Sequence, residues 1–103
     1  MELKDCMATI LKKRKSLSLN DDFGIEKCWN DMTELLTQNE DETIHYLEES
    51  KEDDLYFISE IFEDISEKLQ SERFIACLRK LDKKFPELDM TKDINIAESY
   101  IEN

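Results

Sequence analysis

The side chains of this chain that could do chemistry are nearly all carboxylates, and they are concentrated in its middle. Residues 20 to 67 contain seventeen Asp and Glu against two Lys, a net charge of −15, whereas the whole 103-residue chain carries −12. Residues 1 to 19 carry +3, and residues 68 to 103 carry no net charge. A field of this sign attracts basic partners and repels nucleic-acid phosphates and anionic membranes. The composition therefore predicts a basic protein partner and argues against nucleic-acid or membrane binding.

Two dense groups of these carboxylates, in residues 39–42 and 52–54, have the oxygen ligands that a hard cation prefers. Neither group has the alternating ligands and central glycine of a calcium loop. We therefore expect no metal site and no other cofactor. A solvated surface that favours solubility accounts for any single acid. It accounts poorly for their confinement to one segment, because crowded like charges repel one another and destabilise the fold.

Groups for nucleophilic or acid–base catalysis are scarce. His45 is the only histidine, and no Ser or Cys belongs to a recognised nucleophile motif. Gly24 is the only glycine, so no glycine-rich loop is present to bind phosphate. Cys6, Cys28 and Cys77 lack the paired spacing of a zinc site. The sequence predicts a binding protein and not an enzyme.

The cysteines and the N-terminal segment predict a cytoplasmic location. An odd number of widely spaced cysteines within apolar-periodic stretches is typical of reduced thiols and not of a disulfide framework. The short apolar stretch Cys6–Leu11 precedes the basic run Lys12–Lys15, the reverse of the order in a signal peptide. No apolar run approaches the roughly 20 residues that a bilayer requires.

The basic run Lys12–Lys15 is the main cationic feature of the acidic molecule. It could contact nucleic acid, but the acidic remainder of the chain would oppose the approach of phosphate. Four cations at the end of a helix also complement its dipole. We expect an internal role, in which this run offsets part of the charge of the acidic helices.

The fold class follows from the spacing of the apolar residues, which recur at steps of three and four along the chain. One Gly and one Pro are too few for a fold that depends on hairpin turns. The sequence predicts one all-α domain over residues 1–103, with about six short antiparallel helices in a compact bundle or a short α-solenoid-like stack. The expected helices cover about 2–16, 22–37, 40–49, 52–69, 71–84 and 91 onward.

Local signals mark several of these boundaries. Asn39 followed by Glu42 is close to a capping box, and Ser71 and Thr91 stand where two further helices begin. Pro86 ends the fifth helix, because proline disfavours the α conformation at the residue before it. Trp29 lies on the apolar stripe of the second helix, which makes it a core anchor first.

The expected helix 52–69 has two chemically distinct faces. At 100° per residue, an apolar sector of about 160° collects the residues Leu55, Phe57, Ile58, Ile61, Phe62, Ile65 and Leu69. The opposite face contains Asp53, Tyr56, Glu60, Glu63, Asp64 and Glu67. A tyrosine is therefore expected within a face of five carboxylates.

Three stretches of the C-terminal half, taken together, resemble a known class of protein: Leu55–Leu69, Ser71–Leu78 and Lys84–Ile94. Together they resemble the small, acidic, helical immunity proteins of bacterial contact-dependent inhibition and related polymorphic toxin systems. The resemblance is one of general pattern. It implies a protein that stays in the cytosol of the producing cell and binds the C-terminal toxin domain of a cognate effector, often an RNase or DNase. It carries over no contact residue, since such families vary most where they touch the toxin.

The residues themselves are consistent with this role. Nuclease domains are basic because they bind phosphate, and an acidic helical face can imitate their substrate and steer association. The predicted contact residues are Glu48, Glu49, Asp53, Tyr56, Glu60, Glu63, Asp64 and Glu67. The carboxylates would pair with Lys and Arg of the toxin, and Tyr56 would be the apolar anchor. Packing of Tyr56 against the helix 40–49 is the alternative for that side chain.

Other functions remain open on the sequence alone. An acidic adaptor or regulatory protein could bind a different basic protein through the same face. An enzyme or a metal-binding protein is a second class, which retention of a stoichiometric metal would identify. Homodimerisation through the apolar sector of helix 52–69 is a further possibility.

Overall fold

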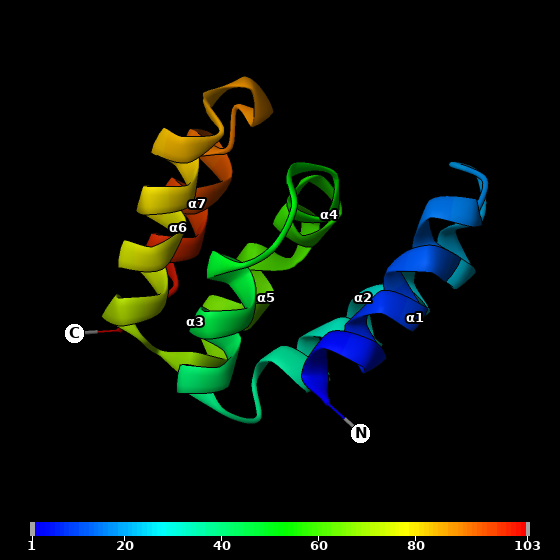
Figure 1. Ribbon diagram of the computed structural model, residues 1–103, viewed down its shortest axis with the longest axis horizontal. Helices are drawn as coiled ribbons and strands as arrows, with labels where there is room; N and C mark the ends of the chain where they lie inside the picture. The colour runs from blue at the N-terminus through cyan, green and yellow to red at the C-terminus, as the bar shows by residue number, and fades with distance from the viewer. Residues whose placement is uncertain (1, 103) are drawn as a thin grey trace.

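The computed structural model describes residues 2–102, and Figure 1 shows them as packed helices. In chain order the elements are α1 (Leu3–Ser16), α2 (Asp22–Leu36), α3 (Glu40–Glu48), α4 (Glu52–Ile58), the 3₁₀ segment η1 (Ser59–Ile61), α5 (Phe62–Leu69), α6 (Glu72–Lys84), the 3₁₀ segment η2 (Pro86–Leu88) and α7 (Thr91–Ser99). The described residues contain no strand, so the predicted all-α class is confirmed. None of these helices has both the length and the apolar character needed to cross a bilayer.

The helices form two groups in space. α1 and α2 make an antiparallel hairpin that lies to one side of the other helices (Figure 1). In the second group α5 packs on α7, and α6 packs on both α7 and α3. The hairpin contacts this group through α1 against α3 and α4, and through α2 against η1 and α5. The α4–η1–α5 segment therefore joins the two groups.

The chain has a radius of gyration of 12.9 Å, the value of a compact fold of about 100 residues. Its hydrophobic core lies where these helices meet. Phe62 and Phe74 meet edge to face in its centre, with ring centroids 6.4 Å apart. The apolar sector expected in residues 52–69 faces this core, and its fully buried members are Leu55, Ile58, Ile61, Phe62 and Ile65. Five of the seven sector residues are therefore covered within the single chain, and homodimerisation through this sector stays a prediction.

The expected single helix over 52–69 was also wrong, because η1 interrupts it. Ile61 has φ −120° and ψ 13°, outside the α region, and α4 and α5 do not share one straight axis (Figure 1). The Ser59 hydroxyl donates to the carbonyl of Tyr56 at 2.7 Å, a local hydrogen bond that competes with the helical ladder. A projection at 100° per residue consequently fails across residues 59–61, and it misplaces Glu60.

The caps show where local signals suffice. Asn39 accepts from the backbone N–H of Glu42 at 3.0 Å, and the Ser71 hydroxyl accepts from the N–H three residues on at 3.0 Å, so both predicted caps are confirmed. The predicted cap at Thr91 was wrong: Thr91 is the first residue of α7, and its hydroxyl donates to the Asp82 carboxylate. A partner nine residues away replaces the cap.

Candidate functional site

A hollow of about 270 Å³ opens between the α4–η1–α5 segment and α7. Its lining residues are Tyr56, Ser59, Glu60, Glu63, Asp93 and Ile96, and we call this site the acidic hollow. Three of the eight predicted contact residues line it. Asp93 and Ile96 come from α7 and were not predicted. The hollow combines two exposed apolar side chains with three carboxylates, which makes it a candidate binding site for a basic group.

The packing of α5 on α7 sets the shape of the hollow. Ser66 of α5 is fully buried, and its hydroxyl donates to the carbonyl of Ala97 at 2.6 Å. Ile94 and Ala97 are also fully buried, so one face of α7 is fixed in the core. Asp93 and Ile96 lie beside these buried positions and are held facing the α4–η1–α5 segment.

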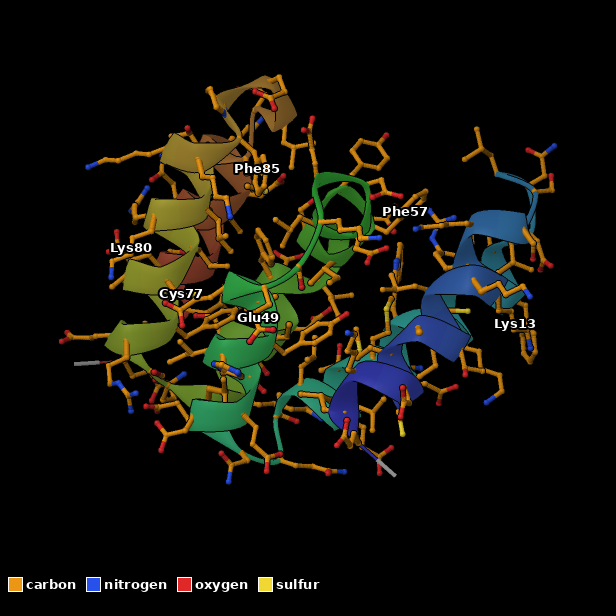
Figure 2. The ribbon with its side chains drawn as sticks, in the orientation of Figure 1. Lys13, Glu49, Phe57, Cys77, Lys80 and Phe85 are labelled. Atoms are coloured by element: carbon orange, nitrogen blue, oxygen red, sulfur yellow. The ribbon has the colours of Figure 1, made fainter. Side chains whose placement is uncertain are left out.

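The apolar part of the hollow is Tyr56 and Ile96, which are 58% and 39% exposed. The ring of Tyr56 meets the ring of Phe57 edge to face, with centroids 5.1 Å apart. Phe57 lies between α4 and α1 (Figure 2), where the Arg14 guanidinium stands 5.1 Å from its ring centroid. Tyr56 therefore packs on Phe57 on one side and is open to solvent on the other. It lines the hollow together with α7 instead of packing against α3.

The carboxylates of the hollow differ in what they already bind. Glu60 accepts two hydrogen bonds from Arg14, at 3.0 and 2.7 Å, and one from Trp29 Nε1 at 3.1 Å. Glu63 and Asp93 form no ion pair with any residue from 2 to 102. Glu60 is thus committed to the fold, while Glu63 and Asp93 are available to a partner.

Asp93 is the carboxylate of the hollow whose ionisation is perturbed. Partial burial raises its pKa, the nearby charge of Asp89 adds to the rise, and Lys92 opposes it. Asp93 stays exposed in the described chain, so this desolvation is slight, and the carboxylate is open to an incoming Lys or Arg.

The remaining predicted contact residues lie outside the hollow. Asp53 is paired with Lys15 at 3.3 Å, and the hydrogen bond from Lys15 is the main cause of its lowered pKa. Asp64 and Glu67 are exposed on α5. Glu48 is the last residue of α3 and Glu49 follows it, and both are exposed. The structure therefore distributes the eight residues over several places, and their contact with a partner stays a prediction.

A larger cleft of about 750 Å³ lies between α1 and α3, and Glu49 lines it together with His45 and Tyr46. His45 Nε2 is 2.7 Å from Glu49 Oε1, and both side chains are mostly exposed. Burial raises the pKa of Tyr46 to about 12. Lysines as well as carboxylates line this cleft, so it lacks the single sign of charge that marks the acidic hollow. Across residues 2–102, no three His, Cys, Asp or Glu side chains are placed to hold a metal ion.

Two residues of the basic run at the end of α1 have the predicted internal role. Arg14 is buried and pairs with Glu60, and Lys15 pairs with Asp54 at 2.7 Å as well as with Asp53. Lys12 and Lys13 are exposed and form no ion pair within the described chain. The run therefore neutralises part of the acidic segment and leaves two cations at the surface.

A sequence signal for Ile96 exists in hindsight. Ile94 and Ala97 are the buried residues of α7, and Ile96 falls outside their stripe. An apolar residue off the buried stripe of an amphipathic helix indicates an exposed contact.

Comparison of the chain with protein-family models, curated proteins and solved structures found no match.

Proposed function

We propose that this protein is an immunity protein, which binds and neutralises a basic toxin domain through the acidic hollow. The observation that carries the proposal is the placement of two exposed apolar side chains, Tyr56 and Ile96, beside two carboxylates without cations, Glu63 and Asp93. Interfaces concentrate their binding energy in such aromatic anchors surrounded by complementary polar groups.

The charge of the molecule supports a nuclease as the target. A nuclease must present Lys and Arg to phosphate, and a chain with a net charge of −12 attracts such a surface over a long range. The same charge opposes binding to nucleic acid or to an anionic membrane. The resemblance of the C-terminal half to immunity proteins points to the same class of partner: the C-terminal domain of an effector, met in the cytoplasm of the producing cell.

The contact residues of this proposal differ in part from those predicted from the sequence. We place Tyr56, Glu63, Asp93 and Ile96 at its centre, and Asp64 and Glu67 at its rim. Glu60 supports the site from within the fold and does not serve as a partner ligand.

An acidic adaptor or regulatory protein is the second candidate, because the same hollow would accept a cation from another basic protein. The two functions differ in what the partner does to a cell. A toxin arrests growth when it is expressed alone, and a housekeeping partner does not.

The test is a rescue experiment with the toxin domain encoded directly beside the gene for this chain. We expect the domain to stop growth of a bacterial host and co-expression of this chain to restore it. Glu63→Lys with Asp93→Lys should abolish the rescue. Glu34→Lys with Glu72→Lys makes the same change in net charge at exposed acids outside the hollow, and it should rescue normally.

Two results would count against the proposal. Full rescue by the hollow variant would exclude the hollow as the binding site. A neighbouring gene product that is harmless when expressed alone, yet binds the chain, would favour the adaptor function.

A further inference from the structure

The corner between α1 and α2 presents the two most exposed large apolar side chains of the described residues. Leu19 is 82% exposed and Phe23 is 84% exposed, and neither belongs to the core cluster. Single exposed apolar residues are common, and two large ones four positions apart at one corner, which we call the patch, are a candidate for an interaction site.

The corner is held in one conformation. The Asp21 carboxylate accepts from the backbone N–H of Gly24 at 2.9 Å, and the Asp21 N–H donates to the carbonyl of Ser18 at 3.0 Å. The N–H of Asn20 donates to the hydroxyl of Ser18 at 3.2 Å. These bonds fix the start of α2 and therefore the position of Phe23. Covering the patch therefore costs side-chain entropy but little backbone entropy.

Exposed charges of both signs lie on the two helices that this corner joins. Lys12 and Lys13 are exposed near the end of α1, and Asp22 and Glu26 are exposed near the start of α2. Within residues 2–102 these four side chains form no ion pair. Since α1 and α2 are antiparallel neighbours (Figure 1), both pairs lie towards the end of the hairpin where the corner is, and Lys13 lies at its outer side (Figure 2).

We propose that the α1–α2 corner, formed by Leu19, Phe23 and the flanking pairs Lys12–Lys13 and Asp22–Glu26, binds the same corner of a second copy of the chain. In a two-fold contact the cations of each copy face the acids of the other, and the apolar side chains meet near the axis. The acidic hollow cannot do this, because its copy would present the same negative charge.

This inference is independent of the proposed function. The corner and the acidic hollow share no lining residue, so a dimer would present two open hollows. The patch is small beside the roughly 1,200–2,000 Å² buried in stable interfaces, and we therefore expect a dimer that dissociates on dilution.

Sedimentation equilibrium of the full chain in about 0.15 M salt, where long-range repulsion is screened, tests the proposal. The mass should rise with concentration from 12.3 kDa towards twice that value. Leu19→Ser with Phe23→Ser should raise the dissociation constant by about tenfold or more. Tyr56→Ser with Ile96→Ser removes the exposed apolar pair of the hollow and should leave it unchanged. Circular dichroism checks that each variant is folded.

Exchange of the charges gives an independent readout. The variants K12E/K13E and D22K/E26K should each lose self-association, because like charges then meet across the axis. Mixed together, they should form a heterodimer, since one copy supplies the acids and the other the cations. A wild-type mass of 12.3 kDa at every concentration, a dimer lost only in the hollow variant, or no association of the mixture would each overturn the proposal.

Discussion

Arg14 and Glu60 lie 46 positions apart in the sequence and form a two-pronged ion pair, with Arg14 Nε 3.0 Å from Glu60 Oε1 and Arg14 Nη2 2.7 Å from Glu60 Oε2. Trp29 Nε1 donates to the same carboxylate at 3.1 Å. One side chain of η1 therefore joins α1 and α2 to the second group of helices. The break in the expected helix lies where this carboxylate turns inward.

Replacing Glu60 with Ala should destabilise the fold. The buried Arg14 guanidinium would lose its partner and the Trp29 N–H its acceptor, so we expect the free energy of unfolding to fall by about 2 to 4 kcal/mol. Urea denaturation measures this. Asp31→Ala breaks the exposed pair with Lys27 and should cost less than about 0.5 kcal/mol. Equal losses in the two variants would show that the Arg14 pair does not join the groups.

The only glycine of the chain serves the cap of α2. A Cβ atom on Gly24 would lie 2.8 Å from Asp21 Oδ2, so alanine there would displace the capping carboxylate. Loss of the cap costs about 1 kcal/mol, and alanine in place of glycine returns about 1 kcal/mol of helix propensity. Gly24→Ala should therefore be nearly neutral by thermal unfolding. In an Asp21→Ala background it should stabilise by about 1 kcal/mol, and an equal effect in both backgrounds would contradict the coupling.

Asp93 should make stability depend on pH. Its pKa is raised in the folded protein, chiefly by burial, so ionisation costs the folded state more than the unfolded chain. The folded state is favoured while the carboxyl is protonated, and this advantage is lost as pH rises through the folded pKa. Compared with wild type, Asp93→Asn should gain free energy of unfolding as pH rises from about 3.9, the usual pKa of Asp, through the raised pKa of the folded state. A constant difference between the two proteins across this range would show that the carboxyl is not desolvated.

The three thiols should differ in reactivity. Burial raises the pKa of Cys77 to about 11, Cys28 is also buried, and Cys6 is partly exposed. A disulfide reagent attacks the thiolate, so one equivalent should react quickly at pH 8 and two only after unfolding. The fast equivalent should disappear in Cys6→Ser. Rapid reaction of two or three thiols in the native protein would mean that the core opens more readily than its packing indicates.

The parts of the fold that could be predicted from the sequence are those that local interactions determine. The apolar spacing identifies the helices and the inward sector of residues 52–69, and the caps at Asn39 and Ser71 need only neighbouring backbone groups. The break at η1 could not be predicted. It coincides with the contacts of Glu60 to residues 46 and 31 positions away, and helical periodicity carries no information about such contacts.

Only part of the candidate site was predicted, because helical periodicity does not show which residues of α7 pack beside α5. Tyr56 and Glu63 were assigned to an exposed acidic face, and the structure places both at the hollow. Asp93 and Ile96 complete that hollow from α7, and only the packing of α5 on α7 brings them there. Three predicted residues are acidic like those of the hollow but lie outside it: Glu48, Glu49 and Asp53.

The measurement that tests the central claim most directly is the association rate between the chain and its proposed partner, the toxin domain expected beside its gene. It compares wild type, the hollow variant E63K/D93K and the control E34K/E72K, which has the same net charge, at about 0.05 M and about 0.3 M salt. Binding through the acidic hollow predicts that the hollow variant associates at least about tenfold more slowly than the control at low salt, and that the difference narrows at high salt. Equal rates for the two variants would show that only the total charge matters and would contradict the assignment of the hollow.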